Sequence, residues 1–129
     1  MVGIKDIQVK ELNVRNLKVS ASLEIENPNS VGLDLSRTSL SIYTEGKLIG
    51  TIDQTHDTEM PAKSVFDLPI DLHLELSKLY DGDIMKALEL GNKIMTERQI
   101  SITISGYLYA GKDQIKLKVP IDREEIIEL

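Results

Sequence analysis

The sequence contains no cysteine and no tryptophan, and its 129 residues include only one phenylalanine and four tyrosines. Without cysteine, disulfide bonds, thiol catalysis and cysteine-ligated zinc or iron–sulfur sites are excluded. With so few aromatic side chains, the core must be built from Ile, Leu and Val, and β-branched residues favour sheets. We therefore expect an aliphatic β-core that no covalent cross-link holds together.

Positive charge is also scarce, because 21 acidic residues face 15 basic ones and leave a net charge of −6. Binding to a phosphate backbone needs clustered Lys and Arg, so nucleic acid is not an expected partner. No apolar run approaches the ~20 residues of a membrane helix, and the first ten residues do not form a signal segment. A chain of this length predicts one domain, residues 1–129.

Strict alternation of apolar and polar residues predicts most of the structure as β-strands. In the clearest example, residues 17–26, every odd position is apolar. This strand ends at Asn27-Pro28-Asn29, because proline has no N–H for the ladder and asparagine side chains cap turns. The longest alternating run covers residues 66–76. Its Pro69 lies on the outward phase, which predicts a sheet edge or an unpaired N–H side there.

Six further strands are predicted at residues 4–14, 31–35, 40–44, 48–52, 100–109 and 115–121. The first changes its inward phase near Lys10, which indicates a β-bulge, and it turns into the next strand at residues 14–16. Glu45-Gly46 is the expected hairpin corner between the strands on either side of it. The polar stretch Asp53–Glu59 predicts a loop, and Gly106 indicates a close approach or a bulge.

Residues 77–97 break the alternation and predict a single amphipathic helix with Asp83 as a capping residue. Its apolar positions recur every three or four residues and form one stripe: Ile84, Ala87, Leu88, Gly91 and Met95. We expect the helix to fray near Gly91. Seven or eight strands with one helix inserted at about 77–97 predict an antiparallel β-sandwich of two sheets, and a barrel remains the alternative.

Five short motifs follow one another along the chain in a distinctive order. They are Asn27-Pro28-Asn29, Val31-Gly32-Leu33, Gly46-Lys47-Leu48-Ile49-Gly50, Met60-Pro61-Ala62-Lys63-Ser64 and Val119-Pro120-Ile121-Asp122. This ordered set resembles the late-embryogenesis-abundant type 2 family, which carries the water-stress and hypersensitive-response (WHy) domain. The helix between the long strand and the last hairpin is similar to that of the bacterial, lipoprotein-like branch. The resemblance covers nearly the whole chain.

The resemblance implies an immunoglobulin- or fibronectin-III-like sandwich that is not an enzyme and acts in tolerance of desiccation or other stress. Asn27, Pro28 and Asn29 form the family motif, which we expect to be structural. Bacterial relatives are often lipoproteins tethered through an N-terminal cysteine. Since this chain has no cysteine, a periplasmic, lipid-anchored location would require a trimmed anchor segment, and a cytoplasmic location is the alternative.

Candidate sites for chemistry are few and isolated. His56 and His73 are far apart in sequence, whereas a zinc site needs three or four converging ligands. The acidic residues Asp53, Asp57, Glu59, Asp81 and Asp83 could supply oxygen ligands to calcium, but their spacing does not match a calcium loop. No Gly-x-Ser-x-Gly turn or glycine-rich phosphate loop is present. We therefore predict no catalytic, cofactor-binding or metal site.

Two classes of function remain. The first is protection of proteins or membrane surfaces during water stress by weak shielding of low specificity, carried out by a monomer without a small-molecule substrate. The second is a specific adhesion or assembly module of the cell envelope, in which a strand edge or the helix face recognises one partner. The tyrosines, Tyr43, Tyr80, Tyr107 and Tyr109, either mark such a surface or cover the edges of the core.

Overall fold

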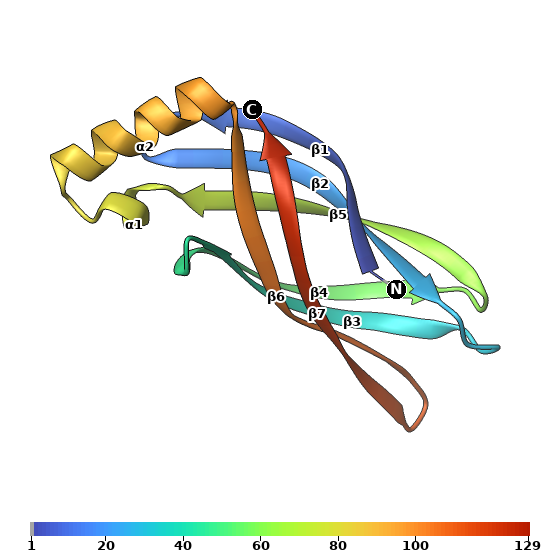
Figure 1. The fold of residues 1–129 in the computed structure, drawn as a ribbon. Helices are drawn as coiled ribbons and strands as arrows, with labels where there is room; N and C mark the ends of the chain where they lie inside the picture. The colour runs from blue at the N-terminus through green and yellow to red at the C-terminus, as the bar shows by residue number, and fades with distance from the viewer. Residues whose placement is uncertain (1) are drawn as a thin grey trace.

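Seven antiparallel strands form two sheets in the computed structural model, which describes residues 2–129 (Figure 1). The first sheet has the order β1-β2-β5, with β1 (Val2–Leu12), β2 (Asn16–Asn27) and β5 (Ser64–Glu75). The second has the order β4-β3-β6-β7, with β3 (Leu33–Thr44), β4 (Lys47–Met60), β6 (Gln99–Lys112) and β7 (Ile115–Glu128). The predicted antiparallel sandwich is confirmed.

The core lies between the two sheets and is aliphatic, as the composition predicts. All the odd residues of β2 from Leu17 to Ile25 are buried, and each faces an apolar residue of β5, such as Leu74 opposite Leu17. The buried hydrophobic residues of the described chain are Leu, Ile, Val, Ala and Met only. Alternation therefore decides which face of each strand is removed from water.

Two predictions about the second sheet are wrong. Residues 31–35 and 40–44 are not separate strands, because β3 runs unbroken from Leu33 to Thr44. The predicted loop Asp53–Glu59 is the second half of β4, whose residues pair with β3 from Asp34↔Glu59 to Ser39↔Asp53. Because β4 lies at the edge of the sheet, its polar side chains stay in water while its backbone joins the ladder.

The edges of the first sheet agree better with the sequence. The ladder between β1 and β2 shifts register between Val9 and Glu11, where the bulge was predicted, and shifts again between Lys5 and Gln8. Pro69 lies on β5, an edge strand, and pairs with Ser22 of β2. Its missing N–H can therefore face away from the ladder.

The helical insertion lies at the predicted place but is divided into two helices, so the prediction of a single helix is wrong. α1 (Ser77–Tyr80) and α2 (Ile84–Glu97) are separated by Asp81 and Gly82, both in left-handed conformations. Asp83 caps α2 as predicted, because its side chain accepts hydrogen bonds from the N–H groups of Met85 and Lys86. The predicted fraying near Gly91 is absent. Within residues 2–129, no helix has the length and apolar character that crossing a bilayer requires.

Candidate functional site: the face of α2 and the cleft beneath it

α2 exposes apolar side chains that an amphipathic helix would ordinarily bury. Ile84, Met85, Leu88 and Met95, called the helix face from here on, are between 63% and 74% exposed. Only Leu90 and Ile94 of this helix pack against the core. Because successive residues of a helix are rotated by about 100°, the helix face and these two contact residues occupy neighbouring sectors of one broad apolar surface. Three of the five residues of the predicted stripe, Ile84, Leu88 and Met95, are therefore left in water.

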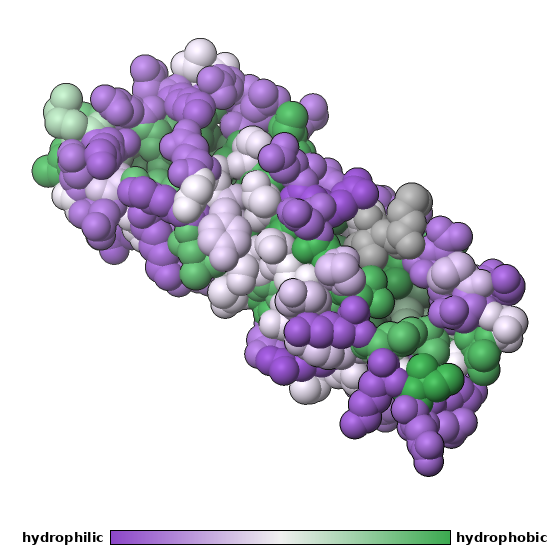
Figure 2. Space-filling model, turned by 60° about the horizontal axis from the view of Figure 1, so that its bottom comes forward, coloured by the Kyte–Doolittle hydropathy of each residue, from purple (hydrophilic) through white to green (hydrophobic). Residues whose placement is uncertain are grey.

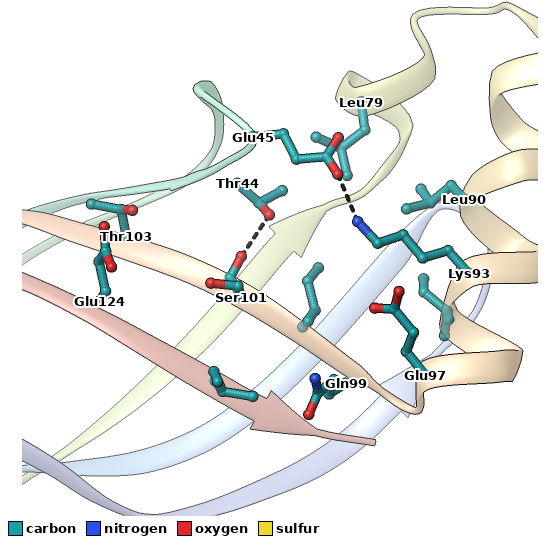
Figure 3. A pocket seen from close by; sticks show the side chains of 13 residues that line it. Thr44, Glu45, Leu79, Leu90, Lys93, Glu97, Gln99, Ser101, Thr103 and Glu124 are labelled. Carbon is teal, nitrogen blue, oxygen red and sulfur yellow. Dashed lines mark hydrogen bonds and ion pairs between the residues drawn. The ribbon is translucent and has the colours of Figure 1, made fainter.

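An ion pair connects α2 to the second sheet, and a cleft lies between the two (Figure 3). Nζ of Lys93 lies 2.9 Å from Oε1 of Glu45, at the tip of the β3–β4 hairpin. This contact holds the pKa of Lys93 above its usual value, because the carboxylate accepts a hydrogen bond from the ammonium group. A cleft of about 280 Å³ lies beneath, between the helix residues Leu90 and Ile94 and the sheet residue Ile100. A second hollow, of about 330 Å³, is also lined by Glu45 and Lys93.

These contacts attach α2 weakly. No residue of α2 is fully buried, and an exposed ion pair contributes only about 0–1 kcal/mol. α1 adds a hydrogen bond of 3.4 Å from Nζ of Lys47 to the carbonyl oxygen of Leu79. The helix is therefore an amphipathic element that rests on the end of the sandwich by one side and offers its other apolar side to solvent.

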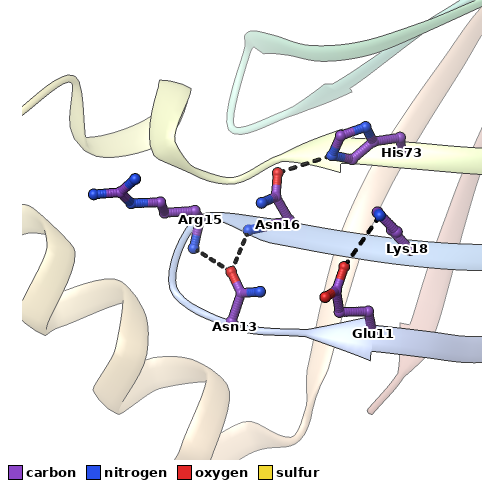
Figure 4. A network of polar contacts seen from close by, with 6 residues as sticks. All are labelled: Glu11, Asn13, Arg15, Asn16, Lys18 and His73. Atoms are coloured by element: carbon purple, nitrogen blue, oxygen red, sulfur yellow. Dashed lines mark hydrogen bonds and ion pairs between the residues drawn. The ribbon is translucent and has the colours of Figure 1, made fainter.

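The base of the insertion is held by the turn between β1 and β2 (Figure 4). Oδ1 of Asn13 accepts hydrogen bonds from the N–H groups of Arg15 and Asn16, at 2.9 and 2.8 Å. The carbonyl oxygen of Arg15 accepts from the N–H of Ser77, the first residue of α1. Oδ1 of Asn16 lies 2.8 Å from Nε2 of His73 on β5. His73 therefore serves in a structural contact between two strands.

The other candidate residues for chemistry are also engaged separately. His56 lies on β4, not in a loop, and its Nε2 is 2.9 Å from Oγ1 of Thr38. Asp53 forms a two-point ion pair with Arg37, which holds the pKa of this carboxyl below its usual value. Within residues 2–129, no three His, Asp or Glu side chains are placed to hold a metal ion together.

The turn at Asn27-Pro28-Asn29 is organised by a buried amide. Asn27 is only 2% exposed, and its Nδ2 lies 3.2, 3.2 and 3.1 Å from the carbonyl oxygens of Val31, Met60 and Pro61. Its Oδ1 accepts from the N–H and the side chain of Asn29. One side chain therefore joins the end of β2 to the loop that follows it and to the turn between β4 and β5. Pro28 is exposed and has no comparable contact.

Sequence reasoning missed a cationic and aromatic surface on the outer face of the second sheet. The side chain of Lys118 on β7 places Nζ 4.0 Å from the ring centroid of Tyr107, and the guanidinium carbon of Arg37 lies 5.6 Å from the ring centroid of Tyr109. Tyr107 and Tyr109 alternate with buried residues of β6, so the same period-2 rule that predicts the core could have placed both rings on one outer face.

Comparisons of sequence agree with the architecture. A family model described as late embryogenesis abundant protein matches residues 22–125, a range that contains all five ordered motifs. Among curated proteins there is no significant match.

Several solved structures share the fold. A protein of Arabidopsis thaliana superposes with a TM-score of 0.72 at 18% identity, over 99% of this chain and 80% of that one. A protein of Archaeoglobus fulgidus gives a TM-score of 0.64 at 13% identity, over 98% and 95%. A putative late embryogenesis abundant protein gives 0.56 at 14%, over 100% and 70%. At these identities the likeness concerns the fold alone. Because the family model spans most of the chain, the protein belongs to the late embryogenesis abundant type 2 family.

Proposed function

We propose that this protein is a non-enzymatic protectant that shields other proteins or membrane surfaces during water loss. Membership of the family gives it a stress-related role of the late-embryogenesis type. The desiccation setting, the low specificity and the absence of catalysis are part of the proposal. They are supported by the separate structural contacts of the candidate histidines and acids and by the surface described next.

The helix face is the observation that carries the proposal. Exposed apolar groups on an otherwise charged surface favour contact with apolar surface that appears on a partly unfolded client. The net charge of −6 then keeps the covered clients apart by repulsion. Met85 and Met95 add flexible, polarizable side chains that adapt to differently shaped partners. Such contact is weak and general, so a single substitution should change it little.

Recovery of a labile enzyme after drying or freeze–thaw tests the proposal. The protein is added over a series of ratios, with an unrelated acidic β-sandwich of equal mass as control. We expect recovery clearly above the control. A triple variant with Ile84→Gln, Leu88→Gln and Met95→Gln should require a severalfold higher ratio for half-maximal recovery, because glutamine keeps helix propensity while removing the apolar surface.

A matched triple variant separates the helix face from general surface hydrophobicity. Val14→Gln, Val31→Gln and Val65→Gln change exposed apolar residues that lie outside the helices, and protection should be retained. In urea unfolding, the free energy of unfolding of each triple variant should differ from that of the parent by no more than about 0.5 kcal/mol per substitution. Equal protection by both triple variants would refute the role of the helix face. Recovery no better than with the control sandwich would refute shielding itself.

A further inference from the structure

One end of β7 is exposed on both of its faces. Every residue from Lys112 to Pro120 is exposed, although Ile115, Leu117 and Val119 alternate as in a half-buried strand. Val119 pairs with the buried Leu108 of β6, so these three residues lie on the inner face of the second sheet. They are nevertheless 37–53% exposed, because the first sheet does not cover them. The β6–β7 hairpin projects beyond the other strands (Figure 1).

An apolar groove lies beside these residues. It has a volume of about 240 Å³ and is lined by Leu117 and Val119 of β7, Leu35 of β3, Met60 of β4 and Ile25 of β2. Hydrophobic side chains gather at the end of the molecule where the hairpin projects (Figure 2). The groove therefore lies between strands of both sheets, along the inner face of β7.

The backbone of β7 has a free edge at the same place. β7 is the last strand of its sheet, and its register with β6 runs without a shift from Gln99↔Glu128 to Lys112↔Ile115. Pro120 has no N–H to donate to β6. The ladder stays unbroken because the nitrogen of Pro120 points away from β6, to the free edge. Because backbone groups alternate in direction along a strand, the N–H and C=O groups of Lys116 and Lys118 then point to the free edge as well.

The charges at this edge select the partner. Lys112, Lys116 and Lys118 have no ion-pair partner among the salt bridges of residues 2–129. A second copy of β7, paired antiparallel about Leu117, would place Lys116 opposite the lysine at position 118 of its partner, and like charges in that position are destabilising. An acidic strand would be attracted by the same lysines.

We propose that the β7 edge, residues 115–119, binds an extended segment of another protein in which apolar and acidic residues alternate. Residues that pair across a ladder share a face. Partner residues opposite Lys116 and Lys118 therefore lie on the same outer face as these two lysines and are acidic. Those opposite Ile115, Leu117 and Val119 point to the groove and are apolar. The segment is about five residues long, the length of the edge before Pro120 ends its donors.

Defence against aggregation explains only part of this arrangement. Lysine and proline commonly protect a strand edge from pairing with like strands. That role does not require apolar residues on the uncovered inner face of the strand. The β7 edge combines a free ladder, an apolar groove and basic side chains.

A synthetic peptide, acetyl-Leu-Glu-Val-Glu-Leu-amide with a fluorescent label, tests the proposal. Fluorescence anisotropy measures its affinity, and NMR follows the amide groups of residues 112–120. We expect shift changes confined to this segment and slower hydrogen exchange at Lys116 and Lys118. A peptide with lysine in place of both glutamates should bind at least about tenfold more weakly, because like charges then face each other. N-methylation of both glutamates should have an equal effect, because it removes the donors that face β7.

Charge-swapped variants complete the test. The double variant Lys116→Glu, Lys118→Glu should reverse the preference and bind the lysine peptide better, whereas Lys63→Glu, Lys86→Glu, at exposed positions elsewhere, should leave it unchanged. Equal binding of both peptides, no shift change in residues 112–120, or dimerisation through the same amides would overturn the proposal. The inference is independent of shielding, because the β7 variants leave α2 intact and enzyme recovery measures shielding alone.

Discussion

Replacement of Asn27 tests the account of the turn at residues 27–29 most directly. Nδ2 of this residue has two N–H donors and lies within 3.2 Å of three carbonyl oxygens, those of Val31, Met60 and Pro61. Pro61 has a second donor in the hydroxyl of Ser64. Asn27→Ala therefore deprives mainly two carbonyl groups of a side-chain donor. At about 1–3 kcal/mol for each unsatisfied group, the expected loss is about 3 kcal/mol.

The assay is urea unfolding followed by circular dichroism, together with a thermal melt. A loss of about 3 kcal/mol corresponds to a fall in Tm of about 10 °C for a domain of this size. Asn29→Ala is the matched control, since Asn29 is exposed and its side chain makes one hydrogen bond, to Asn27. It should cost less than about 1 kcal/mol. Equal losses of stability in the two variants would refute the role of the buried Asn27 amide.

Asn27→Asp adds a pH dependence whose sign follows from the same geometry. The introduced carboxyl must be protonated to donate to the carbonyl oxygens, so its pKa in the folded protein lies above the unfolded value of about 3.9. The variant therefore loses stability relative to the parent as pH rises from the unfolded to the folded pKa, by about 1.4 kcal/mol per unit. The deficit should be smaller at pH 4 than at pH 7, and an equal deficit at both would contradict this assignment.

Three further outcomes are expected. Gly106→Ala should cost at least about 3 kcal/mol in urea unfolding, because a Cβ there would overlap the carbonyl oxygen of Ser39 on β3; a loss below about 1 kcal/mol would contradict the close approach. Gly91→Ala should stabilise by about 0.5–1 kcal/mol, because nothing lies within 4 Å of the added group and alanine favours the interior of α2; a measured loss would show that the site is crowded. An NMR titration should place the carboxyl pKa of Asp53 below 3.8, and Arg37→Gln should return it toward that value; no change on removal of Arg37 would refute the ion pair.

Much of the sandwich follows from the sequence, because period-2 alternation is a local property. Residues 17–26 and 66–76 predict β2 and β5 nearly to their ends, and the two strands then pair through their apolar positions. The cap at Asp83 is also local, since it depends on a side chain that reaches N–H groups two and three residues away.

The candidate surfaces depend on which elements cover a face. Residues 53–59 are polar on both phases and become a strand only because β3 offers a ladder. Ile84, Leu88 and Met95 form an apolar stripe in the sequence, but α2 rests on Leu90 and Ile94 and leaves that stripe in water.

The sequence by itself determined most of the strands, the aliphatic core and the family to which the chain belongs. The tertiary structure alone decided that α2 exposes its helix face and that Ile115, Leu117 and Val119 lie uncovered beside a groove. The physical reason is that alternation states which side chains share a face of a strand or helix. Whether that face meets another sheet or water depends on how far each sheet extends over the other, and residues distant in the chain set that overlap.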